Sequence, residues 1–190
     1  MGIQLSKRMS ALASLVTEGS RLADIGTDHG YIPIALVQKG RIPSALAMDI
    51  GKGPLSRARE HIHSQGLDTY IETRLSDGLT ELHEGEADTV LIAGMGGMLM
   101  KRILEGGGHC LSSVGELILQ PQSEIHLVRK FLAEHGEVVN QVKADPGNTD
   151  LRTFIREELF GCLFSALFNQ KGRAFAHYYY GENDAPYYPA

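Results

Sequence analysis

Apolar residues along the first three quarters of the chain recur in two alternating patterns. Short, nearly continuous apolar runs are typical of strands that are buried on both faces of a sheet. Between these runs, apolar residues return every three or four positions, which is typical of amphipathic helices. The alternation spans residues 20–145. It predicts an α/β fold, a Rossmann-like, doubly wound and mostly parallel sheet with helices on both faces.

The predicted elements follow one another with few residues between them. The pattern predicts strands at residues 21–26, 44–50, 70–76, 88–94, 116–122 and 137–145. It predicts helices at residues 5–17, 32–38, 54–65, 97–108 and 123–136. Pro54 suits the first turn of its helix, and Ser123 is expected to cap the last one.

The end of the chain has a different character. The turn cluster DPGNTD (145–150) marks a boundary. Apolar residues over 151–167 have helical spacing, and RAFAHYYYG after Gly172 suggests a closing strand. Of the 7 Tyr and 6 Phe, all but Tyr31, Tyr70 and Phe131 lie from Phe154 onward. We therefore expect two parts, an α/β domain at 1–145 and an aromatic-rich segment at 146–190.

Composition and charge exclude several classes of protein. A 43% hydrophobic and 22% charged chain is ordinary for a globular domain, which excludes broad disorder. The net charge of −5 argues against a strongly basic nucleic-acid module and leaves room for a local basic patch. Two cysteines, with no signal peptide and no long apolar run, predict a cytoplasmic protein without membrane spans. The eight His show no metal-ligand spacing, so no metal is expected.

The turn after the first predicted strand reads Asp24-Ile25-Gly26-Thr27-Asp28-His29-Gly30. A pyrophosphate site would have a second glycine where Asp28 stands. The carboxylates of Asp24 and Asp28 would repel a pyrophosphate and suit a cationic group, such as an α-amino group or a sulfonium. Gly26 would let the backbone approach a ligand closely. The alternative is that Asp24 only caps the turn and Asp28 is solvated.

The next two strand ends add candidate ligand residues. Asp49 lies about 20 residues beyond Gly26, where an acid can bind both hydroxyls of a ribose. Asp77 could accept from an adenine amino group while Leu79 packs on the ring, and an ordinary strand-ending turn is equally consistent. These strand ends predict a site for a nucleoside that carries no phosphate.

The fourth and fifth strand ends complete the set. Gly94, Gly96 and Gly97 are costly in entropy unless the backbone there approaches a ligand. Gln120 offers a donor and an acceptor to a base edge. S-adenosylmethionine, which combines an amino-acid end, a sulfonium, a ribose and an adenine without phosphate, satisfies all of these features.

Six motifs, in this order and spacing, resemble the bacterial tRNA (adenine-22, N1)-methyltransferase family, TrmK. They are LSKRM (5–9), ADIGTDHGYIP (23–33), MDIGKGPL (48–55), SDGL (76–79), EADTVLIAGMGG (86–97) and LILQP (117–121). The resemblance covers roughly residues 4–145. It implies a class I methyltransferase fold, S-adenosyl-L-methionine as cofactor and tRNA as substrate, and leaves the oligomeric state open.

The motifs and the resemblance together assign expected roles. Asp28 matches the family's candidate catalytic aspartate, with His29 as the alternative base. The expected cofactor-binding residues are Leu5, Arg8, Asp24, Gly26, Asp28, Asp49, Ile50, Asp77, Gly78, Leu79, Ala93, Gly94, Met95 and Gly96. The expected substrate residues are Tyr31, Gly97, Lys101, Arg102, Gln120 and Pro121. Tyr31 suits either stacking on a base or a place in the core.

The expected function is methyl transfer to N1 of adenine 22 in tRNA. The alternatives are a methyltransferase of the same fold acting on a small molecule or a protein, and a non-catalytic binding module that uses the aromatic tail. The family continues with a helical domain that helps to hold tRNA. This chain diverges from the family after Asp145, so that domain is expected to be absent or reduced.

Overall fold

The computed structural model describes residues 3–134, 162–168 and 174–180, in which strands and helices alternate up to Glu134. The strands are β1 (Leu22–Ile25), β2 (Ala45–Asp49), β3 (Ile71–Leu75), β4 (Thr89–Gly96), β5 (Glu116–Ser123), β6 (Cys162–Phe168) and β7 (Ala174–Tyr180). The helices are α1 (Lys7–Leu15), α2 (Tyr31–Gln38), α3 (Lys52–Ser64), α4 (Gly97–Gly106) and α5 (Ile125–Glu134), with a 3₁₀ turn, η1, at Leu111–Ser113.

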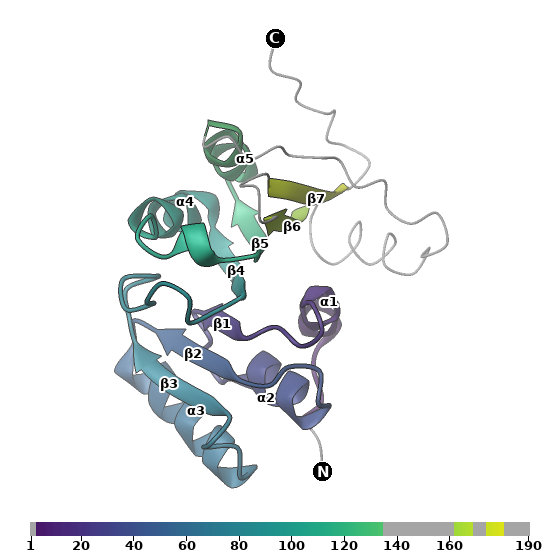
Figure 1. The fold of residues 1–190 in the computed structure, drawn as a ribbon, viewed down its shortest axis with the longest axis vertical. Helices are drawn as coiled ribbons and strands as arrows, with labels where there is room; N and C mark the ends of the chain where they lie inside the picture. The colour runs from purple at the N-terminus through teal and green to yellow at the C-terminus, as the bar shows by residue number, and fades with distance from the viewer. Residues whose placement is uncertain (1–2, 135–161, 169–173, 181–190) are drawn as a thin grey trace, which may run out of the picture.

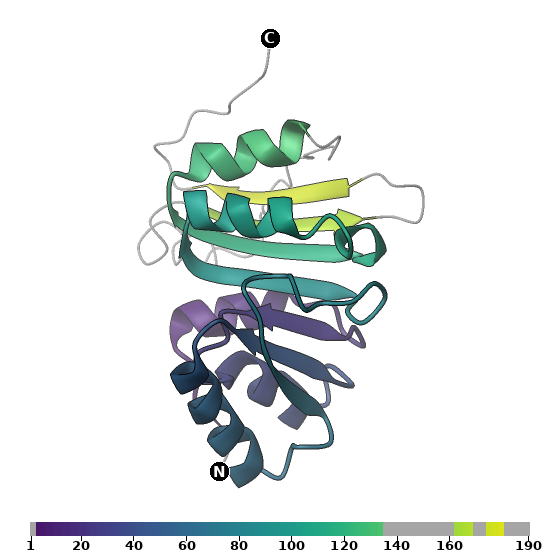
Figure 2. The ribbon, with the colours of Figure 1, turned by 90° about the vertical axis from the view of Figure 1, so that its left-hand side faces the viewer.

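The strands form one sheet of seven in the order β3-β2-β1-β4-β5-β6-β7 (Figures 1 and 2). Strands β1 to β5 are parallel to one another. Strand β6 runs antiparallel to both β5 and β7. The order reverses at β1, with β2 on one side and β4 on the other, which is the switch point of a doubly wound sheet. The predicted Rossmann-like α/β class is confirmed.

Helices cover the two faces of the sheet separately, with α1 and α4 on opposite sides (Figure 1). Leu22 and Leu91 belong to a buried cluster that includes residues of α1, α2 and α3. Their neighbours Ala23 and Val90 belong to a second cluster with residues of α4 and α5. Because successive strand residues point to opposite faces, both kinds of position must be apolar. This explains the uninterrupted apolar runs.

The prediction of a helix over residues 151–167 is wrong from Cys162 onward, where β6 pairs with β5. The sequence CLFSALF is short, apolar and rich in Phe, and such a run fits a strand as well as a buried helix. The exposed edge of β5 favours the strand over the helix, because pairing with β6 satisfies the backbone hydrogen-bonding groups of β5. β7 lies where the closing strand was predicted. The predicted strand at 137–145 and residues 146–161 lie outside the described residues.

The predicted cap at Ser123 is also wrong, because β5 continues through that residue and α5 begins at Ile125. Glu124 between them has a φ of 50°, which turns the chain sharply. Its carboxylate accepts a hydrogen bond from the Met98 N–H at 3.2 Å, in the first turn of α4. The corner between β5 and α5 therefore holds the start of α4.

Gly97 lies against this corner with no room for a side chain. A Cβ there would clash with the backbone carbonyl oxygens of Ser123 and Glu124. Gly106, at the other end of α4, would place a Cβ in open space. The two glycines offer a matched comparison within one helix.

We predict that Gly97→Ala lowers the free energy of unfolding by about 1–3 kcal/mol, because backbone atoms must shift to admit the methyl group. Gly106→Ala should instead raise the free energy of unfolding by about 0.5–1 kcal/mol, since alanine favours the helix. Urea denaturation of both variants measures these changes. Equal effects at the two positions would contradict the packing described here.

Candidate functional site

The carboxyl ends of the first four strands bring the predicted turns to one edge of the sheet. The N–H groups of Gly26 and Thr27 donate to the carbonyl oxygen of Met48 at 2.8 and 3.0 Å. The Ser76 N–H donates to the carbonyl oxygen of Asp49 at 2.9 Å. These bonds tie the turn after β1 to the end of β2, and the end of β2 to the turn after β3. Ligands of open α/β sheets bind at this edge.

Asp24 is buried near the end of β1, with 6% of its surface exposed. Its Oδ2 accepts a hydrogen bond from the Thr27 hydroxyl at 2.8 Å. Burial raises the pKa of Asp24 to about 6; the hydrogen bond from Thr27 lowers it and the nearby charge of Asp49 raises it. A cationic ligand would stabilise the charged form of this carboxylate and offset the cost of its burial.

Two glycines at this edge have other side chains packed where their own would lie. Gly26 and Gly94 have φ of 74° and 76°, a conformation that favours glycine. A Cβ at Gly26 would clash with the Met95 methyl group, and one at Gly94 would lie 3.3 Å from Nη1 of Arg8. The Met95 side chain at the end of β4 therefore packs against the turn after β1, where Gly26 has no side chain of its own.

Arg8 of α1 and Gln120 of β5 meet at this end of β4. Arg8 Nη1 donates to Gln120 Oε1 at 3.2 Å, and the Gly94 N–H donates to the same oxygen at 3.1 Å. Gln120 is buried, with 2% of its surface exposed. The structure thus joins three residues that the sequence assigned separately to cofactor and substrate, and the amide oxygen of Gln120 is engaged within the protein.

Asp49 holds the turn that carries Asp28. Asp49 Oδ1 accepts from the Gly51 N–H at 2.8 Å, and its Oδ2 accepts from the Asp28 N–H at 3.4 Å. Asp28 has a left-handed φ of 51° and an exposed side chain. Its Oδ1 lies 3.1 Å from Arg57 Nη2, and its Oδ2 lies 3.5 Å from His29 Nε2. The two candidate catalytic groups are therefore neighbours.

Three aromatic rings lie beside this pair. His29, Tyr31 and His61 have ring centroids 5.1–5.4 Å apart and nearly parallel planes. The His61 Nδ1–H donates to the carbonyl oxygen of His29 at 3.0 Å, which fixes the tautomer of His61. Tyr31 is the first residue of α2 and is half-buried, so its burial is consistent with either base stacking or core packing.

Other predicted residues lie at the rim of the edge. Ile50 is 65% exposed at the end of β2. Asp77, after β3, lies 3.6 Å from Arg102 of α4, and both side chains are exposed. Lys101 pairs with Glu105 at 2.9 Å. Asp77, which is predicted to accept from the adenine amino group, thus lies beside Arg102, which is predicted to bind RNA.

The structure does not bring every predicted side chain to the edge. Leu79 is 1% exposed and packs in the core with residues of α4. Pro121 is buried and pairs with Met95 across β5 and β4. Gly78, with a φ of 62°, would place a Cβ against the Ile103 side chain. The Leu5 side chain packs against the core cluster of α1 and α2.

The remaining predicted residues form the end of β4 and the start of α4. Ala93, Met95 and Gly96 are half-buried where the register of β4 with β5 becomes irregular. Gly97 is buried against the β5–α5 corner. Sequence reasoning assigned no role to Arg57 or His61. Their spacing of four residues on a predicted helix was a signal that they share a face.

The described residues contain neither a metal-ligand cluster nor a helix that could cross a membrane. Within residues 3–134, 162–168 and 174–180, no three or more His, Cys, Asp or Glu side chains are grouped so that they could hold a metal ion. Among the same residues, no helix has the length and hydropathy needed to cross a membrane.

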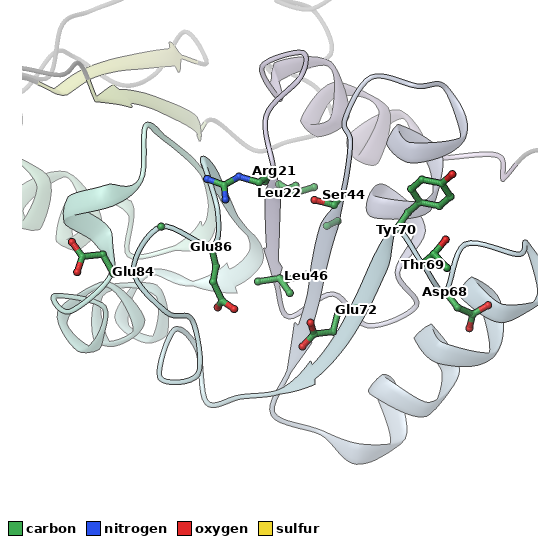
Figure 3. Close-up of a pocket in the computed structure, with 12 residues that line it drawn as sticks. Arg21, Leu22, Ser44, Leu46, Asp68, Thr69, Tyr70, Glu72, Glu84 and Glu86 are labelled. Carbon is green, nitrogen blue, oxygen red and sulfur yellow. The ribbon is translucent and has the colours of Figure 1, made fainter.

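A cavity of about 560 Å³ lies at the opposite edge, near the amino ends of β1, β2 and β3 (Figure 3). Asp68 and Tyr70 lie on one side of it, and Glu84 and Glu86 on the other (Figure 3). Arg21 also lines the cavity and forms an ion pair with Asp88 at 2.7 Å. Because this cavity shares no lining residue with the carboxyl edge, the candidate site does not depend on it.

The chain belongs to the methyltransferase-domain family, whose model matches residues 5–143. A second model, described as a domain of unknown function, matches residues 124–189 and overlaps the first in α5. The fold and the family together define a class I, Rossmann-like methyltransferase domain.

Comparison with individual proteins confirms the resemblance to TrmK. The chain is 39% identical over 130 residues to the tRNA (adenine(22)-N(1))-methyltransferase of Bacillus subtilis, covering 68% of this chain and 55% of that protein. A crystal structure of B. subtilis TrmK is 36% identical with a TM-score of 0.68, covering 72% of this chain and 58% of that one. The chain therefore spans little more than half the length of this relative.

Two other relatives extend the comparison. Streptococcus pneumoniae Sp1610, crystallised in complex with S-adenosyl-L-methionine, is 42% identical with a TM-score of 0.68, covering 70% of this chain and 63% of that one. The ribosomal protein L11 methyltransferase of Syntrophomonas wolfei is 31% identical over 152 residues, covering 76% of this chain and 48% of that protein.

We predict that Asp24→Asn stabilises the protein relative to the wild type as the pH rises. The pKa of about 6 in the folded state lies above the ordinary 3.8, so the folded protein holds this proton more tightly than the unfolded chain does. The stability from this residue is present below pH 4 and is lost as the pH rises through 6. Between pH 4 and 7 the difference in unfolding free energy should shift by about 2–3 kcal/mol in favour of the variant, whose amide stays neutral. Denaturation across this range measures the shift, and parallel pH profiles would contradict the burial cost.

Proposed function

We propose that this protein is an S-adenosylmethionine-dependent methyltransferase that methylates N1 of adenine 22 in tRNA, acting in the cytoplasm. The observation that carries the proposal is the buried Asp24 carboxylate beside the left-handed Gly26 turn, at the switch point of a methyltransferase-family sheet. The S-adenosyl-L-methionine complex of Sp1610 supports the choice of cofactor. The B. subtilis relative supports the choice of substrate.

The residues at the carboxyl edge fit this cofactor. Asp24 would receive the α-amino group, and Asp49 would accept from the ribose hydroxyls. At Gly26 the Met95 methyl group occupies the place that a side chain would take, so Met95 lies beside the turn that would face the cofactor. Ile50 presents an exposed apolar side chain to the adenine ring, in the place that the buried Leu79 cannot fill. When bound, S-adenosylmethionine would supply a methyl group on a cationic sulfur.

The protein's part in the reaction is to align the substrate base with the cofactor and to stabilise the charge that forms on the base. Adenine N1 has a usable lone pair, so the main requirement is to hold it in line with the methyl carbon. The methylated base is cationic, and the exposed carboxylate of Asp28 would stabilise that charge or take a proton from the exocyclic amine. His29, 3.5 Å from Asp28, is the alternative base. Tyr31 would stack on a base that has left the RNA helix.

Basic side chains near this edge would meet the RNA backbone. Lys101 and Arg102 follow the glycine-rich end of β4 on α4. Their ion pairs with Glu105 and Asp77 involve partly or largely exposed side chains, and such pairs contribute little to stability. Phosphate groups could therefore replace these acidic partners.

We predict that the purified protein transfers a labelled methyl group from S-adenosylmethionine to bulk bacterial tRNA. The tRNA should come from cells that lack this modification, and nucleoside mapping should place 1-methyladenosine at position 22. A transcript with guanine at position 22 should accept no methyl group. Asp24→Ala should bind no cofactor by calorimetry and should serve as the inactive control.

Labelling of protein instead of tRNA would contradict this substrate and would favour a protein substrate, as the similarity to the L11 methyltransferase suggests. Normal cofactor affinity in Asp24→Ala would contradict the site itself.

A second prediction separates chemistry from binding. Asp28→Ala should lower kcat for tRNA methylation by about 10²–10⁴-fold, the usual range for a positioned acid or base. Its cofactor affinity should change little, because Asp24 and Asp49 remain. Steady-state kinetics and calorimetry give the two values, and unchanged turnover would exclude a catalytic role for Asp28.

A further inference from the structure

Helix α3 presents two side chains to the turn that carries the candidate catalytic residues. Arg57 Nη2 donates to Asp28 Oδ1 at 3.1 Å, and His61 Nδ1 donates to the His29 carbonyl oxygen at 3.0 Å. Residues four apart lie one above the other on a helix, so one face of α3 reaches two consecutive turn residues. The catalytic turn is thereby attached to a rigid element.

Within the turn, one backbone hydrogen bond crosses Asp28, from the Gly30 N–H to the Thr27 carbonyl oxygen at 3.0 Å, and it does not touch the Asp28 side chain. Gly26 and Gly30 have φ of 74° and 71°, and Asp28 between them has a φ of 51°. Glycines reach many backbone conformations, and the left-handed region is uncommon for other residues. The direction of the Asp28 side chain therefore depends on contacts from outside the turn.

The other contact that holds Asp28 is weaker. Its N–H lies 3.4 Å from Asp49 Oδ2, near the upper limit for a hydrogen bond. Under the proposed function, Asp49 also accepts from the cofactor ribose. The Arg57 guanidinium is thus the close, charged contact to the carboxylate itself, and it engages Oδ1 while Oδ2 faces His29.

We propose that Arg57, supported by His61, is a positioning residue that aims the Asp28 carboxylate at the substrate base. The inference rests on the proposed function of the same site. Both side chains of the Arg57–Asp28 pair are about half exposed, at 48% and 57%. Exposed ion pairs contribute little to global stability, so we expect this contact to fix the orientation of the Asp28 carboxylate rather than to stabilise the fold.

Arg59 supplies a matched control on the same helix. Its guanidinium donates to the Thr73 hydroxyl of β3 at 3.1–3.2 Å, away from the turn. Arg57→Ala and Arg59→Ala each remove one exposed guanidinium from α3, so they change charge and helix propensity equally. Arg57→Lys keeps a cation within reach of Asp28 but loses the planar fork.

The test measures kcat and KM for tRNA, cofactor affinity, and amide hydrogen exchange of residues 27–30 in all three variants. Arg57→Ala should lower kcat by about tenfold or more, since a small misplacement of a reacting group can cost on the order of 100-fold. Its cofactor affinity should stay within about twofold of the wild type, and exchange in the turn should become faster. Arg57→Lys should recover part of kcat, and Arg59→Ala should match the wild type in every measurement.

Unchanged kcat in Arg57→Ala would overturn the positioning role, as would a parallel loss of cofactor affinity, which would show a general structural role. If the wild-type protein does not methylate tRNA, the proposed function fails. The exchange measurement still decides the positioning contact in that case, because unaltered exchange in Arg57→Ala would show that Arg57 does not hold the turn.

Discussion

The rest of the candidate site depends on a carboxylate buried at the end of a central strand. Asp24 lies between Ala47 of β2 and Leu91 of β4, among neighbours that are almost wholly apolar. An apolar residue at this position would stabilise the fold more, since burial raises the pKa of Asp24 by disfavouring its charged form. Strand β1 therefore breaks the pattern of its own core at the place where the sheet order reverses. The turn that follows supports this carboxylate: the Thr27 hydroxyl donates to it, and Gly26 has no side chain where the Met95 methyl group packs against the turn.

The edge around this carboxylate is held from both faces of the sheet. On one face, Arg8 of α1 reaches Gln120 and the end of β4, and α3 reaches the turn after β1. On the other face, α4 begins against the β5–α5 corner, where Gly97 admits no side chain. Each of these contacts joins segments far apart in the sequence to a loop that carries glycines. Flexible loops let the backbone approach a ligand, and contacts from packed helices restore the precision that the glycines remove.

The sequence alone predicted the structure correctly where neighbouring segments with the same pattern favour one kind of element. The apolar run at residues 88–94 alternates with helical segments on both sides, which favours a strand buried on both faces, and parallel order then brings Asp24, Asp49 and Gly94 to one edge. The sequence was insufficient where the structure of a segment depends on contacts with residues far away in the chain. The segment Cys162–Phe168 became a strand because β5 offered an edge, and Leu79 turned into the core because α4 covers it. Arg57 and His61 contact the turn only through the way α3 packs on the sheet, and local sequence carries no record of that geometry.

The order of the strands separates the candidate site from the two C-terminal strands. The residues proposed to bind the cofactor include Asp24, Asp49 and Gly94 at the ends of β1, β2 and β4, whereas β6 and β7 extend the sheet beyond β5, on the far side from β2 and β3. The two family models overlap in this same region, one ending at residue 143 and the other beginning at residue 124. A change in the chain after α5 can therefore alter what lies beside β5 while the turn after β1 keeps its contacts with β2 and α3.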